Sequence, residues 1–312
     1  MKLNHIYQGD VIDRLKDLND GSVQCVVTSP PYWGLRDYGV DNQLGLEETP
    51  EEFVENLVKV FREVRRVLKD DGTVWLNLGD SYSSGGRTST INQSLRGDKN
   101  YGVTRPKPNK EIKPKDLIGI LWRVAFALQS DGWYLRQDII WHKPNPMPES
   151  VTDRCTKAHE YIFLLSKSPK YYYNADAIKE PVSEVSLKRA EYKWDCDRPS
   201  TKNASLGGKG IHTEKMGNRF VNPEGRNKRS VWKITTKPFK NAHFATFPPE
   251  LPTLCIKAGS KKGDVVLDPF FGSGTTGWVA QRLGRKWLGI ELNPEYIKIA
   301  EKRFIQEELF NG

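Results

Sequence analysis

Short apolar runs rich in β-branched residues alternate with helical segments along most of this chain. Val23–Thr28, Thr73–Leu78 and Val265–Asp268 are three such runs, and each suits a strand that is buried on both faces. This alternation predicts an α/β fold built on an open, mostly parallel sheet with helices on both faces. Ligands of such sheets bind at the carboxyl ends of the strands, so the residues that follow each strand are the first candidates for a site.

The clearest helix signal begins at residue 49. Thr49 can cap the helix, Pro50 suits its first turn, and Glu52 completes a capping box. A helical apolar stripe then runs from Phe53 to Leu68, and Asp71-Gly72 is expected to end it. Further helices are expected at Val11–Leu18, Leu117–Leu128, Leu251–Ala258, Thr275–Leu283 and from Asn293, with further strands at Trp133–Trp141, Glu160–Leu165 and Trp287–Glu291.

Several classes of protein are disfavoured by what the chain lacks. The first ten residues carry no apolar run of the signal-peptide type, and no stretch approaches the roughly 20 apolar residues of a membrane span. We therefore expect a cytoplasmic protein that makes no membrane contact. The four cysteines are scattered without a CxxC pair, which argues against structural zinc and against a disulfide framework: Cys25, Cys155, Cys196 and Cys255.

The positive charge is concentrated in two polar segments. Residues 84–115 hold eight lysines and arginines against two acids, and residues 183–232 hold eleven against six, in a chain whose net charge is +9. Both segments lose the hydrophobic periodicity of their surroundings. They are either solvated loops or surfaces that neutralise a polyanion such as a nucleic acid.

A glycine loop follows the strand at Val265–Asp268, in the sequence VVLDPFFGSGTT. Gly272 and Gly274 allow a sharp turn into a helix and a close approach to a ligand. A phosphate-binding P-loop would need a lysine after the second glycine, but Thr275 stands there. Asp268 would repel a pyrophosphate and suits a cationic group instead, such as the ammonium of S-adenosylmethionine. A purely structural glycine corner is the alternative.

A second acid supports a cofactor site. Glu291 closes the next strand about 20 residues after the loop, where an acid accepts hydrogen bonds from ribose hydroxyls.

The strand Val23–Thr28 is followed directly by Ser29-Pro30-Pro31-Tyr32. Prolines leave the sheet ladder and hold the backbone rigidly, so the Pro30 carbonyl and the Ser29 hydroxyl become fixed acceptors beside the flat ring of Tyr32. Two acceptors near a stacking ring suit the exocyclic amine of a nucleobase. When these acceptors take hydrogen bonds from both N–H groups of the amine, the nitrogen is drawn toward tetrahedral geometry. Its lone pair is then free to attack a sulfonium methyl group. A base in a duplex would have to flip out to reach such a pocket. A plain proline turn is the alternative.

Together these motifs resemble those of the DNA amino-methyltransferases, a family that uses S-adenosylmethionine. TSPPY resembles the catalytic motif and DPFFGSGTT the cofactor motif. The catalytic motif comes first, as in the β group, so the resemblance implies a circularly permuted, Rossmann-like methyltransferase fold.

The resemblance also implies roles for individual residues. Asp10 in IYQGD matches the acid that binds the cofactor adenine, and Glu291 matches the ribose ligand. Thr246 and Phe247 would lie against the methionine part of the cofactor. The residues expected to bind the cofactor are Asp10, Thr246, Phe247, Asp268, Phe270, Gly272, Gly274, Thr275 and Glu291, and those expected at the catalytic corner are Ser29, Pro30, Pro31 and Tyr32.

The same resemblance divides the chain. Residues 1–182 and 231–312 would form the catalytic domain, with a mobile basic insertion at 84–115, and residues 183–230 would form the target-recognition region. Double-stranded DNA is the implied substrate, a restriction endonuclease partner is left open, and the chain would act as a monomer or a homodimer. The expected contacts with DNA phosphates or bases are Arg219, Arg226, Lys228 and Arg229.

The target base is the finer question. Within the family SPPY mostly accompanies cytosine N4 and DPPY adenine N6, so Ser29 favours cytosine N4 and leaves adenine N6 open. His142–Asn145 follows a strand and either flanks the flipped base or forms an ordinary loop. A protein of this fold that binds nucleic acid without activity, or one that methylates RNA or protein, is the remaining alternative.

Overall fold

The computed structural model describes residues 2–35, 39–40, 42–83, 112–185, 225–237 and 247–311, with side chains up to residue 305. The chain divides into two compact units. The larger unit comprises Met1–Asn174 and Ser230–Gly312, and the smaller one comprises Ala175–Arg229. In its described part, the smaller unit contains a short 3-10 helix, η1 (Asp176–Ile178).

One eight-stranded sheet forms the centre of the larger unit. All neighbouring strands run parallel except at β5, which is antiparallel to both of its neighbours. This confirms the expected mostly parallel α/β sheet. The strands, in spatial order, are β1 (His5–Gln8), β8 (Lys286–Glu291), β7 (Val265–Asp268), β2 (Val23–Thr28), β3 (Leu68–Leu78), β5 (His159–Ser166), β4 (Tyr134–His142) and β6 (Val231–Lys233).

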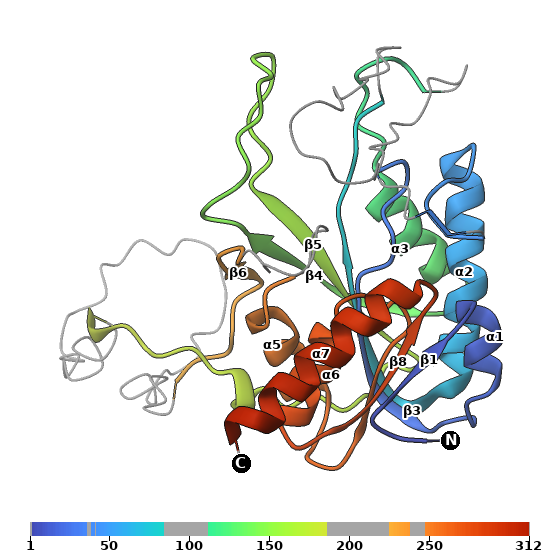
Figure 1. The fold of residues 1–312 in the computed structure, drawn as a ribbon. Helices are drawn as coiled ribbons and strands as arrows, with labels where there is room; N and C mark the ends of the chain where they lie inside the picture. Colours follow the sequence, from blue (N-terminus) through green and yellow to red (C-terminus); the bar gives the residue numbers. More distant parts are fainter. Residues whose placement is uncertain are drawn as a thin grey trace, which may run out of the picture. The chain divides into compact units, whose positions relative to one another are not determined.

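Helices cover the two faces of this sheet (Figure 1). In the first group, α2 (Pro50–Val67) packs against both α1 (Val11–Lys16) and α3 (Ile120–Ser130). The other group also packs in sequence: α5 (Glu250–Gly259), α6 (Thr275–Arg282) and α7 (Pro294–Asn311). No described helix is long and apolar enough to cross a bilayer.

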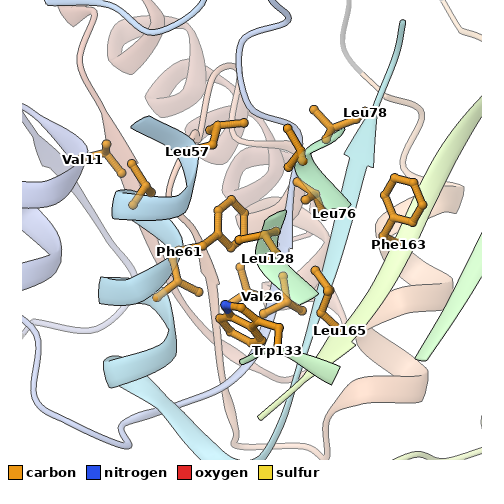
Figure 2. Packing of buried hydrophobic residues seen from close by; sticks show 14 of the residues in the cluster. Val11, Val26, Leu57, Phe61, Leu76, Leu78, Leu128, Trp133, Phe163 and Leu165 are labelled. Atoms are coloured by element: carbon orange, nitrogen blue, oxygen red, sulfur yellow. The ribbon is translucent and has the colours of Figure 1, made fainter. Parts of the chain in front are cut away.

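The main core lies between the first helix group and the sheet (Figure 2). Leu57 and Phe61 of α2 and Leu128 of α3 point toward strand residues such as Val26 and Leu76. All five side chains are fully buried or nearly so. At about 25 cal/mol per Å² of apolar surface removed from water, burial of this kind is the main favourable contribution to folding.

The start of α2 confirms the sequence signal. Thr49 Oγ1 accepts from the Glu52 N–H at 3.2 Å, and Glu52 Oε2 accepts from the Thr49 N–H at 3.3 Å. The expected end is corrected: α2 stops at Val67, and Asp71-Gly72 lies within β3 and not in a break before it. The β2–β3 register shifts between Leu68 and Thr73, so the intervening residues bulge out of the ladder.

Two short strands do not stand out by hydrophobic pattern. β6 has three residues and β1 four, and β1 is only half-buried. β1 pairs with β8, so the first strand of the chain lies beside the last. This is the strand order implied by a circularly permuted methyltransferase fold.

Candidate active site

The strand ends that carry the predicted motifs meet at one edge of the sheet. The parallel strands β1, β8, β7, β2, β3 and β4 all end there, and β5 begins there because it runs the other way. Consequently Ser29 after β2, Asp268 at the end of β7, Glu291 at the end of β8 and Asp10 after β1 belong to one edge. The structure therefore brings both predicted motifs together.

Asp268 connects the two motifs through a buried carboxylate. Thr28 Oγ1 donates to its Oδ1 at 2.6 Å and Thr276 Oγ1 donates to its Oδ2 at 2.7 Å, while the Phe270 N–H donates to Oδ1 at 3.1 Å. The residue is only 2% exposed. Burial raises the pKa of Asp268 to about 7, although the threonine hydrogen bonds act in the opposite direction. Asp268 thus ties the residue before Ser29 to the first turn of α6, and its direct contact with a cofactor stays a prediction.

The glycine loop is shaped by its neighbours. Gly274 caps α6 in the left-handed region at φ 76°, and a Cβ there would lie 3.0 Å from Ala300 Cβ of α7. Its missing side chain therefore lets α6 begin close to α7. Thr275 Oγ1 accepts from Arg303 Nη1 at 2.9 Å, and Phe270 is half-buried against the core.

Glu291 and Asp10 lie at the ends of neighbouring strands, β8 and β1. The Gly272 N–H donates to Glu291 Oε2 at 2.7 Å and the Asn293 N–H to Oε1 at 2.8 Å. Burial raises the pKa of Glu291 despite these bonds. The Gly9 N–H donates to the Glu291 carbonyl at 3.0 Å, which places the chain entering Asp10 next to it.

Asp10 caps α1 through Oδ1, which accepts from the Ile12 N–H at 2.9 Å and the Asp13 N–H at 3.2 Å. This arrangement leaves Oδ2 to accept from a ligand. A carboxylate offers about four acceptor positions, so Glu291 also retains acceptor capacity. Acids at two neighbouring strand ends fit a ligand that presents hydroxyl and amino donors, as the adenosine half of S-adenosylmethionine does.

The corner predicted to be catalytic is partly buried. Pro30 is buried, and Ser29, Pro31 and Tyr32 are half-buried. Ser29 Oγ donates to the Tyr32 hydroxyl at 3.3 Å. The Tyr32 ring lies so close to the backbone at the end of β3 that a Cβ on Gly79 would be 2.6 Å from Tyr32 Cε2.

Sequence reasoning missed two residues at this corner, Asn77 and Glu160. The Tyr32 hydroxyl donates to Glu160 Oε2 at 2.9 Å and lies 3.3 Å from Asn77 Oδ1. Lys143, in the loop singled out after β4, forms an ion pair with Glu160. Glu160 sits at the start of β5, and a search of residues that follow strands does not reach it.

Three described basic residues of the smaller unit gather around one acid. Glu180 lies 3.2 Å from Arg229, 3.4 Å from Arg226 and 3.5 Å from Lys228. Burial favours a higher pKa for Glu180, but Arg229 and Lys228 outweigh it and the pKa is lowered. The Arg229 side chain is 69% exposed and Lys228 only 16%. Arg229 is therefore the better placed of these two to meet a phosphate.

Some predicted residues cannot be placed. Thr246, Arg219 and most of the 84–115 insertion lie outside the described residues. Phe247 is half-buried in the turn that precedes α5. Within the described ranges, no cluster of histidine, cysteine or acidic residues could hold a metal ion.

A family model, curated relatives and solved structures all match this chain, and all of them are DNA methylases. A family model described as "DNA methylase", of the N6/N4 type, matches residues 23–302. The Type II methyltransferase M.Cfr9I of Citrobacter freundii is 49% identical over 97% of this chain and 88% of its own length. M.SmaI of Serratia marcescens, also a Type II methyltransferase, is 49% identical over 96% of this chain and 90% of its own.

Solved structures share the fold. A proposed DNA modification methylase of Thermus thermophilus, solved with S-adenosyl-L-methionine, has a TM-score of 0.59 and 25% identity over 97% of this chain and 93% of its own. The cytosine-N4-specific PvuII DNA methyltransferase has a TM-score of 0.63 and 21% identity over 96% and 85%. The chain therefore belongs to the N6/N4 family of DNA methylases, amino-methyltransferases that take their methyl group from S-adenosylmethionine.

Proposed function

We propose that this DNA methyltransferase modifies the N4 amine of cytosine, at a base flipped out of double-stranded DNA. The observation that supports this most directly is the acceptor at the catalytic corner. Ser29 presents a neutral hydroxyl there; two prolines follow it directly, and its Oγ donates to the Tyr32 hydroxyl at 3.3 Å. A hydroxyl is a weaker acceptor than the aspartate of DPPY motifs. Within the family, SPPY mostly accompanies methylation of cytosine N4.

In this proposal each residue of the corner has a separate task. Ser29 Oγ and the Pro30 carbonyl accept the two hydrogens of the amine and expose its lone pair. Tyr32 offers its ring for stacking, which at about 1–3 kcal/mol per base offsets part of the cost of flipping. No strong base is needed at the outset, because the nitrogen loses its proton readily once it is methylated.

The cofactor side is assigned to the other strand ends. Glu291 would hold the ribose hydroxyls and Asp10 the adenine amine, with Phe247 and Phe270 as apolar neighbours. When bound, S-adenosylmethionine supplies an electrophilic methyl group on a sulfonium. We assign Asp268 the indirect role of linking the catalytic motif to the cofactor loop, because Thr28, Thr276 and the Phe270 N–H take three of its roughly four acceptor positions and the residue is only 2% exposed.

We further propose that residues 183–230 recognise the target sequence, with Arg226, Lys228 and Arg229 as DNA contacts. Their common partner Glu180 holds them in one place on the smaller unit.

Nucleoside mass spectrometry tests the proposed base directly. DNA is methylated by the purified protein with labelled S-adenosylmethionine and then digested to nucleosides. We expect label in N4-methylcytosine. Label in N6-methyladenine would refute the assignment to cytosine and leave the family unchanged, and label found only in RNA or protein substrates would refute the choice of DNA.

A further inference from the structure

A chain of hydrogen bonds leads from Ser29 to an acid outside both motifs. Ser29 Oγ donates to the Tyr32 hydroxyl at 3.3 Å, and that hydroxyl donates to Glu160 Oε2 at 2.9 Å. Asn77 Oδ1 lies 3.3 Å from the same hydroxyl. These residues come from the loop after β2, the start of β5 and the end of β3, so three strands converge on Tyr32.

The direction of this chain follows from counting hydrogens. A phenol hydroxyl carries one hydrogen, and an ionised carboxylate at 2.9 Å is a better acceptor than an amide oxygen at 3.3 Å. With that hydrogen on the bond to Glu160, the phenol oxygen can only accept from Ser29. The Ser29 hydrogen then points toward Tyr32, and the remaining lone pairs of Ser29 Oγ are available to an incoming N–H donor.

Glu160 is itself fixed on both oxygens. Asn77 Nδ2 donates to Oε2 at 3.2 Å, and Lys143 Nζ pairs with Oε1. The Glu160 side chain is 16% exposed and the Lys143 side chain 20%, so the pair is largely withdrawn from water. Lys143 Nζ also lies 4.4 Å from the centroid of the Trp141 ring, which steadies the cation from the other side. The Glu160 carboxylate is thus held in one position beside Tyr32.

We infer that Glu160 is a positioning residue for methyl transfer: through Tyr32 it orients the Ser29 hydroxyl as an acceptor for the target amine. This inference rests on the proposed role of Ser29. Without Glu160, Tyr32 can turn its hydrogen toward Ser29, and Ser29 can then turn its own hydrogen toward the amine. That orientation sets two donors against each other and opposes the geometry needed for attack.

A double-mutant cycle tests the inference. Glu160→Gln removes the charge at constant size, and Tyr32→Phe removes the link and keeps the ring. Because hydrogen bonds to charged groups are the stronger ones, we expect each single variant to lower kcat about ten- to hundredfold. We expect KM for DNA and the Kd for S-adenosylmethionine to change little. The double variant should match Tyr32→Phe to within about threefold, since Glu160 acts only through Tyr32.

Glu63→Gln is the matched control. Glu63 lies on α2 and pairs with Arg66 at 2.8 Å with a comparably sheltered side chain, but it does not touch the corner. If Glu160→Gln lowers kcat no more than Glu63→Gln does, or lowers it by the same factor with and without the Tyr32 hydroxyl, the inference is wrong. Identification of the methylated nucleoside is a separate result: N6-methyladenine would overturn the proposed base while the cycle still decides the role of Glu160.

Discussion

Replacing Asp268 with asparagine should flatten the dependence of stability on pH. Asp268 is buried, and its pKa is raised from an ordinary value of 3.8 to about 7. Between these values the unfolded chain has already released the proton that the folded chain still holds. Stability therefore falls as the pH rises through this window, and the cost is absent below about pH 4 and complete above about pH 7.

The magnitude follows from the shift. About three pKa units at 1.36 kcal/mol each correspond to about 4 kcal/mol at high pH. Between pH 5 and pH 8 the loss from Asp268 alone is about 2.5 kcal/mol, because part of it has occurred below pH 5. Asparagine can occupy the site: Thr276 Oγ1 lies 3.2 Å from the Val27 carbonyl, so its hydrogen can turn there while it accepts from the new amide.

Urea unfolding of the cofactor-free protein, followed by tryptophan fluorescence and circular dichroism, provides the assay. Relative to the wild type, Asp268→Asn should gain about 2.5 kcal/mol from pH 5 to pH 8. Glu291, whose pKa is also raised, is present in both proteins and leaves a residual slope in each. Glu250→Gln serves as control, because its hydrogen bond from Lys237 lowers the pKa of Glu250 and places its titration below this window. A constant difference between Asp268→Asn and wild type across the range would refute the reasoning.

Four further outcomes are expected. Ser29→Ala should lower kcat about a hundredfold, and isothermal calorimetry should find the Kd for S-adenosylmethionine unchanged; an equal loss of cofactor affinity would contradict the assignment. Glu291→Gln should raise that Kd about tenfold or more, measured in the same way, with unaltered affinity counting against a ribose contact. Arg229→Ala should reduce the slope of log affinity for DNA against log salt by about one, whereas an unchanged slope would mean that Arg229 meets no phosphate. Gly274→Ala should destabilise the protein more than Gly263→Ala, by about 1–3 kcal/mol in urea unfolding, because both have positive φ but only Gly274 faces Ala300; equal losses would mean that packing against α7 is unimportant.

The parts of the fold that sequence reasoning captured are those where local signals and burial agree. Val23–Thr28 and Val265–Asp268 are strands with the predicted bounds, because an apolar β-branched run buried on both faces has few alternatives. The capping box fixes where α2 begins. The end of α2 was misjudged because Asp71-Gly72 reads as a helix breaker. In the structure it forms a bulge in which a Cβ on Gly72 would lie 2.7 Å from the Leu68 side chain.

The site was predicted by searching the residues that follow each strand, and this search misses strands that run the opposite way. Residues after parallel strands converge at one edge, and Ser29, Asp268 and Glu291 all follow that rule. β5 runs the opposite way, so its first residues lie at this edge. Glu160 was therefore missed, because it stands at the start of a strand and not after the end of one. Nothing local marks a strand as reversed, because the direction depends on its partners. Likewise, the sequence shows that Asp268 is acidic but not that two threonines and a backbone N–H occupy its carboxylate.

The pairing of β1 with β8 constrains the order in which the sheet can form during synthesis. Asn4 Oδ1 accepts from the Trp287 N–H across a separation of 283 residues, and β2 likewise waits for β7 to gain its second neighbour. The earliest strands to leave the ribosome must therefore stay unpaired on one or both sides until the last quarter of the chain arrives. Nascent chains that stall before β7 would present open strand edges to their surroundings, and Ser29 would meet Asp268 and Glu291 at one sheet edge only after β7 and β8 had been made.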